Sequence, residues 1–222
     1  MKKIFAALLA LVLFCTSALA LQGEGYPAYD GGALPENGLA LQLASGSLLL
    51  EFDDDQDYSG ISDGHLQACY FCFDAKEENY LELYLLLPEK IADGDVITPS
   101  SSFAGGYAST SISLFEVDKD NNETAWFAGQ ILGAGYPQGS DYSISVHSAQ
   151  YTQNSVRVQG SIDAKLCRIE KNQPSGEIIE VKADFDFTLP LSGENASAPQ
   201  PKDAPAAGKA PAFTLPPDYI TL

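Results

Sequence analysis

A serine between two glycines is the first feature of the sequence with catalytic potential. Residues 60–64 read Gly-Ile-Ser-Asp-Gly, which matches the G-x-S-x-G pattern of a nucleophile elbow with Ser62 at its centre. His147 follows in the chain order that such enzymes use and would act as the base. The motif requires a strand-to-helix turn, however, and here it lies in an acidic stretch between runs typical of antiparallel strands. A glycine- and aspartate-rich turn is therefore the preferred interpretation, and Ser62 with His147 is the catalytic alternative.

Aspartates at alternate positions indicate a cation site in the same stretch. Asp53, Asp55 and Asp57 resemble the opening of a calcium-binding loop, and carboxylate oxygens are the ligands that Ca²⁺ prefers. An EF-hand would then require glycine at the sixth position and glutamate at the twelfth, where this chain has Tyr58 and Gly64. The sequence therefore argues against an EF-hand. Solvated turns and no cofactor are therefore the preferred interpretation, and Ca²⁺ bound by Asp53, Asp55 and Asp57 in another geometry is the alternative.

Aromatic residues in loops offer a third chemistry, the stacking of rings on sugars. Gly-Tyr-Pro occurs twice, at residues 25–27 and 135–137, which places Tyr136 in a loop. Together with Trp126, Tyr29 and Tyr142, it would supply flat apolar ring faces with polar edges, of the kind that bind glycans. Packing of these rings over the ends of the fold is the preferred interpretation, and stacking on sugars is the alternative.

The cysteines do not form a metal or redox motif. Cys69 and Cys72 lie in the run HLQACYFCFD, which alternates like a strand, so that residues three apart face opposite sides. No second cysteine pair completes a zinc site. We therefore expect buried thiols, with a disulfide from Cys167 to Cys69 or Cys72 as the alternative.

The elements that would position all these residues are β-strands. Apolar or small residues occupy every second position in two long runs, residues 155–170 and 177–191. A period of two places one face in a core and the other in water. Residues 171–176, KNQPSG, have the composition of a turn between the runs. The two runs therefore predict a long antiparallel hairpin to which other strands are added.

Shorter runs of the same period recur before this hairpin, separated by turns rich in glycine, aspartate and asparagine. Residues 77–87 also fit a helix, but Pro88 and the β-type run before them favour a hairpin. The pattern predicts an all-β domain over residues 38–192. We expect an antiparallel β-sandwich of about eight or nine strands, with a closed antiparallel barrel as the alternative.

The first twenty residues are typical of a secretory signal peptide. Two lysines are followed by an apolar run too short to span a bilayer, and then by Ala-Leu-Ala, which predicts cleavage after Ala20. A lipid-modified Cys15 is the alternative, although the bulky Phe14 before it fits a lipoprotein site poorly. Either way, the protein is expected outside the cell.

Two further segments lack the pattern of a strand. Residues 21–37 are rich in Gly, Pro and Tyr without a period and predict a flexible lead-in. Residues 193–222 form a Pro- and Ala-rich tail that predicts disorder, because it buries too little apolar surface to offset its ordering entropy. Its last ten residues, FTLPPDYITL, regain apolar content, and docking on the domain or on a partner is the alternative for them.

Charge narrows the choice of partner. The chain has 30 acidic and 12 basic residues and a formal net charge of −18. Nucleic acid and anionic membranes repel such a protein, so we expect neither as a partner. The sequence thus predicts a secreted, non-catalytic module that binds an extracellular glycan or surface protein. The alternatives are an exported hydrolase and an assembly protein whose edge strands pair with neighbouring copies.

Overall fold

The chain folds almost entirely into antiparallel strands. The computed structural model describes residues 25–62, 64–74, 76, 78–100, 110–130, 136–171 and 173–191. The expected signal peptide, Cys15 and the expected C-terminal tail lie outside these residues. The strands are β1 (Gly38–Leu43), β2 (Gly46–Asp53), β3 (Gly60–Ser62), β4 (His65–Asp74), β5 (Asn79–Pro88), β6 (Val96–Ile97), β7 (Ser111–Val117), β8 (Glu123–Ala128), β9 (Asp141–Tyr151), β10 (Ser155–Glu170) and β11 (Gln173–Pro190). In the described parts of the chain, no helix has both the length and the apolar character to cross a membrane.

The all-β antiparallel class that the sequence predicts is confirmed. The strands number eleven, more than expected, because β3 and β6 are only three and two residues long and are too short to show a period. The segment that also fitted a helix is β5, which pairs with β4 along its whole length. The hairpin interpretation of that segment is therefore also confirmed.

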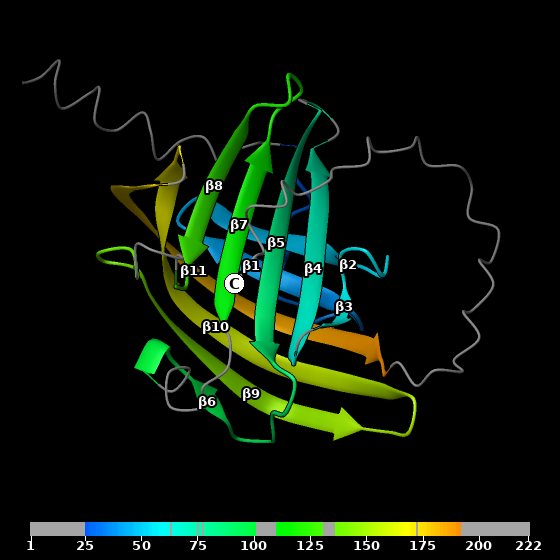
Figure 1. Ribbon diagram of the computed structural model, residues 1–222. Helices are drawn as coiled ribbons and strands as arrows, with labels where there is room; N and C mark the ends of the chain where they lie inside the picture. Colours follow the sequence, from blue (N-terminus) through cyan, green and yellow to red (C-terminus); the bar gives the residue numbers. More distant parts are fainter. Residues whose placement is uncertain are drawn as a thin grey trace, which may run out of the picture.

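The eleven strands belong to one hydrogen-bonded sheet, which turns over into two layers that face each other and that we call the front and rear sheets (Figure 1). The front sheet holds β4, β5, β7 and β8, with β3 on the edge of β4, and the rear sheet holds β2, β1, β11, β10, β9 and β6 in that order. Three residue pairs join β2 to β4 and three join β8 to β10, and these short joins close the hydrogen-bonding into a ring. The rear strands run obliquely across the front ones (Figure 1).

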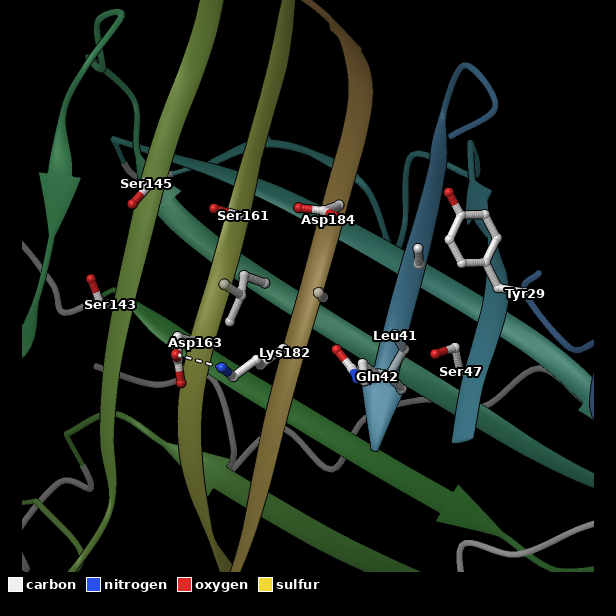
Figure 2. A pocket seen from close by; sticks show the side chains of 13 residues that line it. Tyr29, Leu41, Gln42, Ser47, Ser143, Ser145, Ser161, Asp163, Lys182 and Asp184 are labelled. Carbon is white, nitrogen blue, oxygen red and sulfur yellow. Dashed lines mark ion pairs between the residues drawn. The ribbon is translucent and has the colours of Figure 1, made fainter. Parts of the chain in front are cut away.

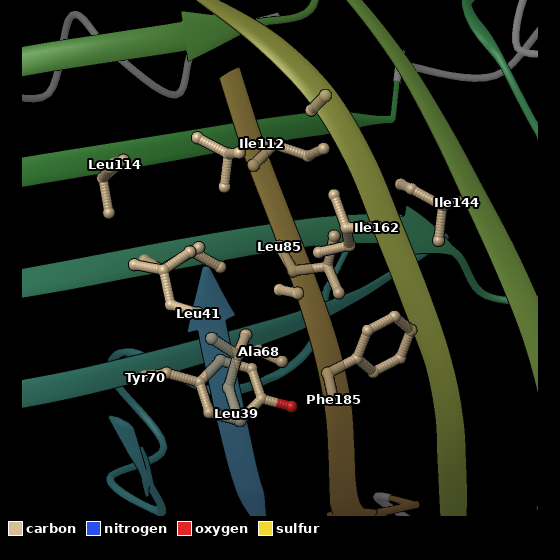
Figure 3. Close-up of a cluster of buried hydrophobic side chains, with 14 of the residues drawn as sticks. Leu39, Leu41, Ala68, Tyr70, Leu85, Ile112, Leu114, Ile144, Ile162 and Phe185 are labelled. Atoms are coloured by element: carbon tan, nitrogen blue, oxygen red, sulfur yellow. The ribbon is translucent and has the colours of Figure 1, made fainter. Parts of the chain in front are cut away.

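One core fills the space between the sheets. It is made by the inward row of each strand, and many of its side chains are fully buried, including Leu39 and Leu41 of β1, Leu85 of β5 and Ile112 of β7 (Figure 3). Phe185 of β11 lies among them and is 1% exposed. The outward-facing rows of the rear sheet carry polar side chains, and the candidate site lies on this face.

The long hairpin is present as β10 and β11, but its turn is shorter than expected. Val156 pairs with Leu189 and Leu166 with Ile179, and the inward residues of both strands are largely buried. Because Glu170 already pairs with Gln173, the connection is shorter than the six residues 171–176 that the sequence predicts. The residues after it, which we expected in the turn, belong to β11 and contain a bulge at Gly176, whose φ of 84° suits glycine.

The described part of the expected lead-in, residues 25–37, runs along β2. Ala28 forms a β-bridge with Leu48, and the N–H of Leu49 donates to the carbonyl of Pro27 at 3.0 Å. Tyr26 is buried in the main core. Backbone hydrogen bonds therefore hold this segment against the rear sheet.

The three cysteines within the described residues are buried free thiols, as expected, and the alternative disulfide is not formed. Cys72 belongs to the main core, whereas Cys69 belongs to a second cluster on the outer face of the front sheet. The two therefore lie on opposite faces of β4, as their spacing in a strand requires.

Asp186 is a buried carboxylate on the outer side of β11 and is 3% exposed. It accepts hydrogen bonds from Arg157 Nε at 3.1 Å, from Arg157 Nη2 at 2.6 Å and from Gln159 Nε2 at 2.9 Å. We expect Asp186→Asn to lower the free energy of unfolding by about 1–3 kcal/mol, measured by urea denaturation, because an amide cannot accept all three bonds. Asp163→Asn is the control, since Asp163 makes only an exposed ion pair with Lys182. Equal losses of unfolding free energy in Asp186→Asn and Asp163→Asn would contradict the stabilising role of the hydrogen bonds to Asp186.

Candidate functional site

A shallow polar trough crosses the outer face of the rear sheet (Figure 2). Its volume is about 350 Å³, and it spans five neighbouring strands from β2 to β9. The polar side chains that line it are Tyr29, Gln42, Ser47, Ser143, Ser145, Ser161, Asp163, Lys182 and Asp184. We call this set the polar trough.

The strand register arranges most of these side chains in two rows. Ser161 lies between Ser145 on β9 and Asp184 on β11, which gives the first row. The second row runs from Ser143 through Asp163, Lys182 and Gln42 to Ser47. All occupy outward positions of period-two strands, which is why they are polar, and the short serines leave the hollow.

Charge in the trough is only partly balanced. Lys182 Nζ lies 3.5 Å from Asp163 Oδ2 across the two central strands, in an exposed pair that contributes little to stability. Asp184 has no such cation within the described residues. At the far side the hydroxyl of Tyr29 donates to the carbonyl of Gly32, which holds the ring in place. The trough thus presents donors, acceptors and one anchored aromatic ring.

A β-bulge in β9 places His147 beside the trough. Gly160 pairs with Val146 and Gln159 with Ser148, so His147 is the extra residue without a partner position on β10. The Nε2 atom of His147 lies 3.2 Å from the Oγ atom of Ser161. The sequence therefore identified a histidine with a serine partner, but the partner is Ser161.

Ser62, the serine of the G-x-S-x-G motif, lies elsewhere. It ends β3 at the edge of the front sheet and pairs with His65 of β4, and its side chain lies outside what the structure describes. The motif connects two antiparallel strands and not a strand and a helix, so it lacks the geometry of a nucleophile elbow.

The Ser161–His147 pair has the first two members of a nucleophilic triad and lacks the rest. Among the described residues, the His147 ring donates no hydrogen bond to a carboxylate that would orient it. Ser161 lies in a strand paired on both sides, with Ser145 and with Asp184, so the sheet ladder uses its backbone groups and leaves none for an oxyanion. The arrangement suits binding better than catalysis.

Two of the candidate rings for stacking on sugars are in the core, which corrects their assignment as ligand-binding candidates. Trp126 is 3% exposed and Tyr142 is 2% exposed, and the Tyr142 hydroxyl donates to the carbonyl of Thr110 at 3.1 Å. Both occupy inward positions of their strands, and Tyr142 shares its row with Ile144 and Val146. Tyr136 packs half-buried against the same core. These three rings do not form an exposed platform.

The three aspartates of the acidic stretch shape a turn after β2. The N–H of Asp55 donates to Asp53 Oδ1 at 3.0 Å, and the N–H of Asp57 donates to Asp55 Oδ1 at 3.0 Å. Burial raises the pKa of Asp53. Within the described residues, no group of three or more His, Cys, Asp or Glu side chains is arranged to hold a metal ion. Ca²⁺ binding at these residues stays a prediction.

Sequence reasoning named Tyr29 as a candidate ring for stacking on sugars but missed most of the trough, including Asp184, Lys182 and Gln42. Each is an ordinary polar residue at an outward position, and only the order β2-β1-β11-β10-β9 brings them together. Searches of protein-family models, of curated proteins and of solved structures found no match to this chain.

Proposed function

We propose that this protein is a secreted, non-catalytic binding module that takes an uncharged glycan in the polar trough. The observation that carries the proposal is the trough itself: an open surface on which hydroxyl, carboxylate, amide and ammonium groups stand in two rows beside an aromatic ring. Sugar hydroxyls both donate and accept hydrogen bonds, so each of these groups offers them a partner. A tyrosine ring adds an apolar face for the C–H side of a sugar.

The openness of the surface fits an extended ligand. The two rows cross five strands on the outer face of the rear sheet. Most of the lining side chains are short, so they lose little rotamer entropy when a ligand binds. A chain of several sugar units fits this surface better than a small molecule, which prefers an enclosed pocket.

The alternatives have weaker support. The Ser161–His147 contact is the observation that favours an exported hydrolase. An assembly protein needs a free edge, but β6 pairs with the middle of β9, and Asp93 Oδ1 accepts from the Ala149 N–H at 2.6 Å. These contacts cover the middle of the β9 edge, between residues 144 and 149.

An array of neutral oligosaccharides tests the proposal, with Asp184→Ala as the variant. We expect the wild-type protein to bind at least one oligosaccharide and the variant to bind it about tenfold or more weakly, because a charged acceptor is lost. Glu180→Ala, also exposed on β11 but outside the trough, should bind like the wild type. Failure to bind any glycan, or equal weakening in both variants, would overturn the proposal. Ester hydrolysis that is lost in Ser161→Ala would establish the hydrolase instead.

A further inference from the structure

The outer face of the front sheet is aromatic, although an exposed sheet face is ordinarily polar. Phe71 and Phe73 of β4, Tyr80 and Tyr84 of β5 and Phe115 of β7 all occupy outward positions there. Phe71 is 38% exposed and Phe73 is 48% exposed. We call these five residues the outer aromatic patch.

The inner part of the patch is already packed. The rings of Tyr84 and Phe115 meet edge to face with centroids 5.7 Å apart, and those of Phe73 and Tyr80 lie 6.2 Å apart. Tyr84 and Phe115 also belong to the buried cluster around Cys69. The patch is therefore a rigid surface whose outer rings remain exposed to solvent.

A carboxylate stands in the middle of these rings. Glu82 lies directly opposite Phe71 on one neighbouring strand and opposite Phe115 on the other, between Tyr80 and Tyr84 on its own strand. The Tyr84 hydroxyl donates to Glu82 Oε2 at 3.4 Å, a long bond that compensates the charge only partly.

No cation neutralises this carboxylate in the part of the chain that the structure describes, because none of the ion pairs there includes Glu82, Asp53 or Glu123. Burial raises the pKa of Glu82, and the charges of Asp53 and Glu123 raise it further. Burial also raises the pKa of Tyr58, and Glu82 is the first of four carboxylates that add to this shift. The patch is thus apolar, aromatic and negatively charged without a counter-charge.

We propose that the outer aromatic patch binds a basic segment of a partner protein, with an arginine or lysine side chain lying over the rings and pairing with Glu82. Arginine stacks on aromatic faces and pairs with carboxylates, so one side chain satisfies both features of the surface. Apolar neighbours in the same segment would cover Phe71 and Phe73. The protein's net charge of −18 would speed the encounter with a basic partner.

Charge also excludes two other occupants. A second copy would place Glu82 and its acidic surroundings against the same charges, which costs free energy. The apolar C-terminal residues 213–222 of this chain contain one aspartate and no lysine or arginine, so they cannot neutralise Glu82. The patch lies on the opposite sheet from the polar trough, and this inference is independent of the proposed function.

Calorimetric titration of the full-length protein with the capped peptide Leu-Arg-Leu-Arg-Leu tests the proposal. We expect binding to the wild-type protein and a Kd that is roughly tenfold higher for Glu82→Gln. Glu180→Gln removes the same charge from the exposed rear sheet, where Glu180 pairs with Lys165, and should leave the Kd unchanged. Equal Kd values for the two variants, or no binding by the wild type, would overturn the proposal.

Two further measurements exclude trivial explanations. The thermal midpoint of Glu82→Gln at pH 8 should equal or exceed that of the wild type, because the substitution removes a half-buried charge. Phe73→Ser changes an exposed ring and should weaken peptide binding without unfolding the protein. Undiminished binding by a folded Phe73→Ser variant would contradict the aromatic part of the proposal.

Discussion

Replacing Gly160 with alanine is expected to lower the free energy of unfolding by about 3 kcal/mol, near the upper end of the cost of overpacking a core. A Cβ atom at this position would lie 2.4 Å from the carbonyl oxygen of Ser145 and 2.6 Å from Cζ of Phe185. The first of these atoms is backbone of the neighbouring strand, and the second is part of a buried ring. Neither can move without shifting β9 or the core.

The close approach at Gly160 has a local cause. The register between β10 and β9 shifts at Gln159 and Gly160, where the bulge adds His147 to β9. A bulge bends its strand locally, and at Gly160 a side chain would meet Ser145 and Phe185, so a glycine is needed there. Gly160 leaves β10 without a packed side chain at this position. Its small size is compatible with the bulge that places His147 beside Ser161.

Urea denaturation of Gly160→Ala and of Gly60→Ala checks this expectation. Gly60, in β3, is the matched control, because the nearest atom to its added Cβ is 3.7 Å away and its φ is not in the left-handed region. We expect Gly60→Ala to change stability by about 0.5 kcal/mol or less. A loss in Gly160→Ala no larger than in Gly60→Ala would show that the β9–β10 pairing relaxes freely.

Period-two patterning predicted the parts of the fold that depend on one strand at a time. The inward rows of β10 and β11 follow the sequence pattern because burying alternate residues is the main stabilising term for a sheet. The same rule, applied strictly, would have placed Tyr142 in the core, since it alternates with Ile144 and Val146. Its candidacy as an exposed ring therefore conflicted with a pattern that the sequence itself contains.

The site depends on features that no single strand carries. The polar trough exists because β11 pairs with β1, a contact between residues far apart in the chain such as Ala183 and Leu41. The Ser161–His147 contact depends on a one-residue bulge, and a polar run such as SVHSA gives no sign of where its register shifts. Strand order and register are set by the packing of the whole core, so local pattern cannot supply them.

The burial of the Glu116 carboxylate could have been predicted from the sequence. Ile112, Leu114 and Glu116 occupy alternate positions of β7, so a carboxylate falls on the inward face, where it is 8% exposed. Burial raises the pKa of Glu116 to about 7, and the charge of Asp118 adds to the shift. Its neighbours across the sheet are Leu81 and Thr124, neither of which is charged. Nothing in this register compensates the ionised form.

We therefore expect the wild-type protein to lose stability as the pH rises from about 4.5 to about 7. In that window the native state keeps a proton on Glu116 that the unfolded chain, with an ordinary pKa of 4.5, has released. A state that binds more protons is favoured at low pH, so the contribution is lost as the pH passes through the native pKa. This shift in the pKa of Glu116 lowers the free energy of unfolding by about 3 kcal/mol above pH 7.

Glu116→Gln removes this titration, and urea denaturation at pH 5 and pH 8 measures the effect. We expect the variant to exceed the wild type by about 3 kcal/mol at pH 8 and by less than about 1 kcal/mol at pH 5, because the native wild-type carboxyl is neutral there. Glu89→Gln, at an exposed position after β5, should match the wild type at both pH values. If the difference in unfolding free energy between Glu116→Gln and the wild type were the same at both pH values, Glu116 would act through shape or hydrogen bonding and not through its charge. A gap that opens only at high pH means that the core holds a carboxyl whose ionisation opposes the fold.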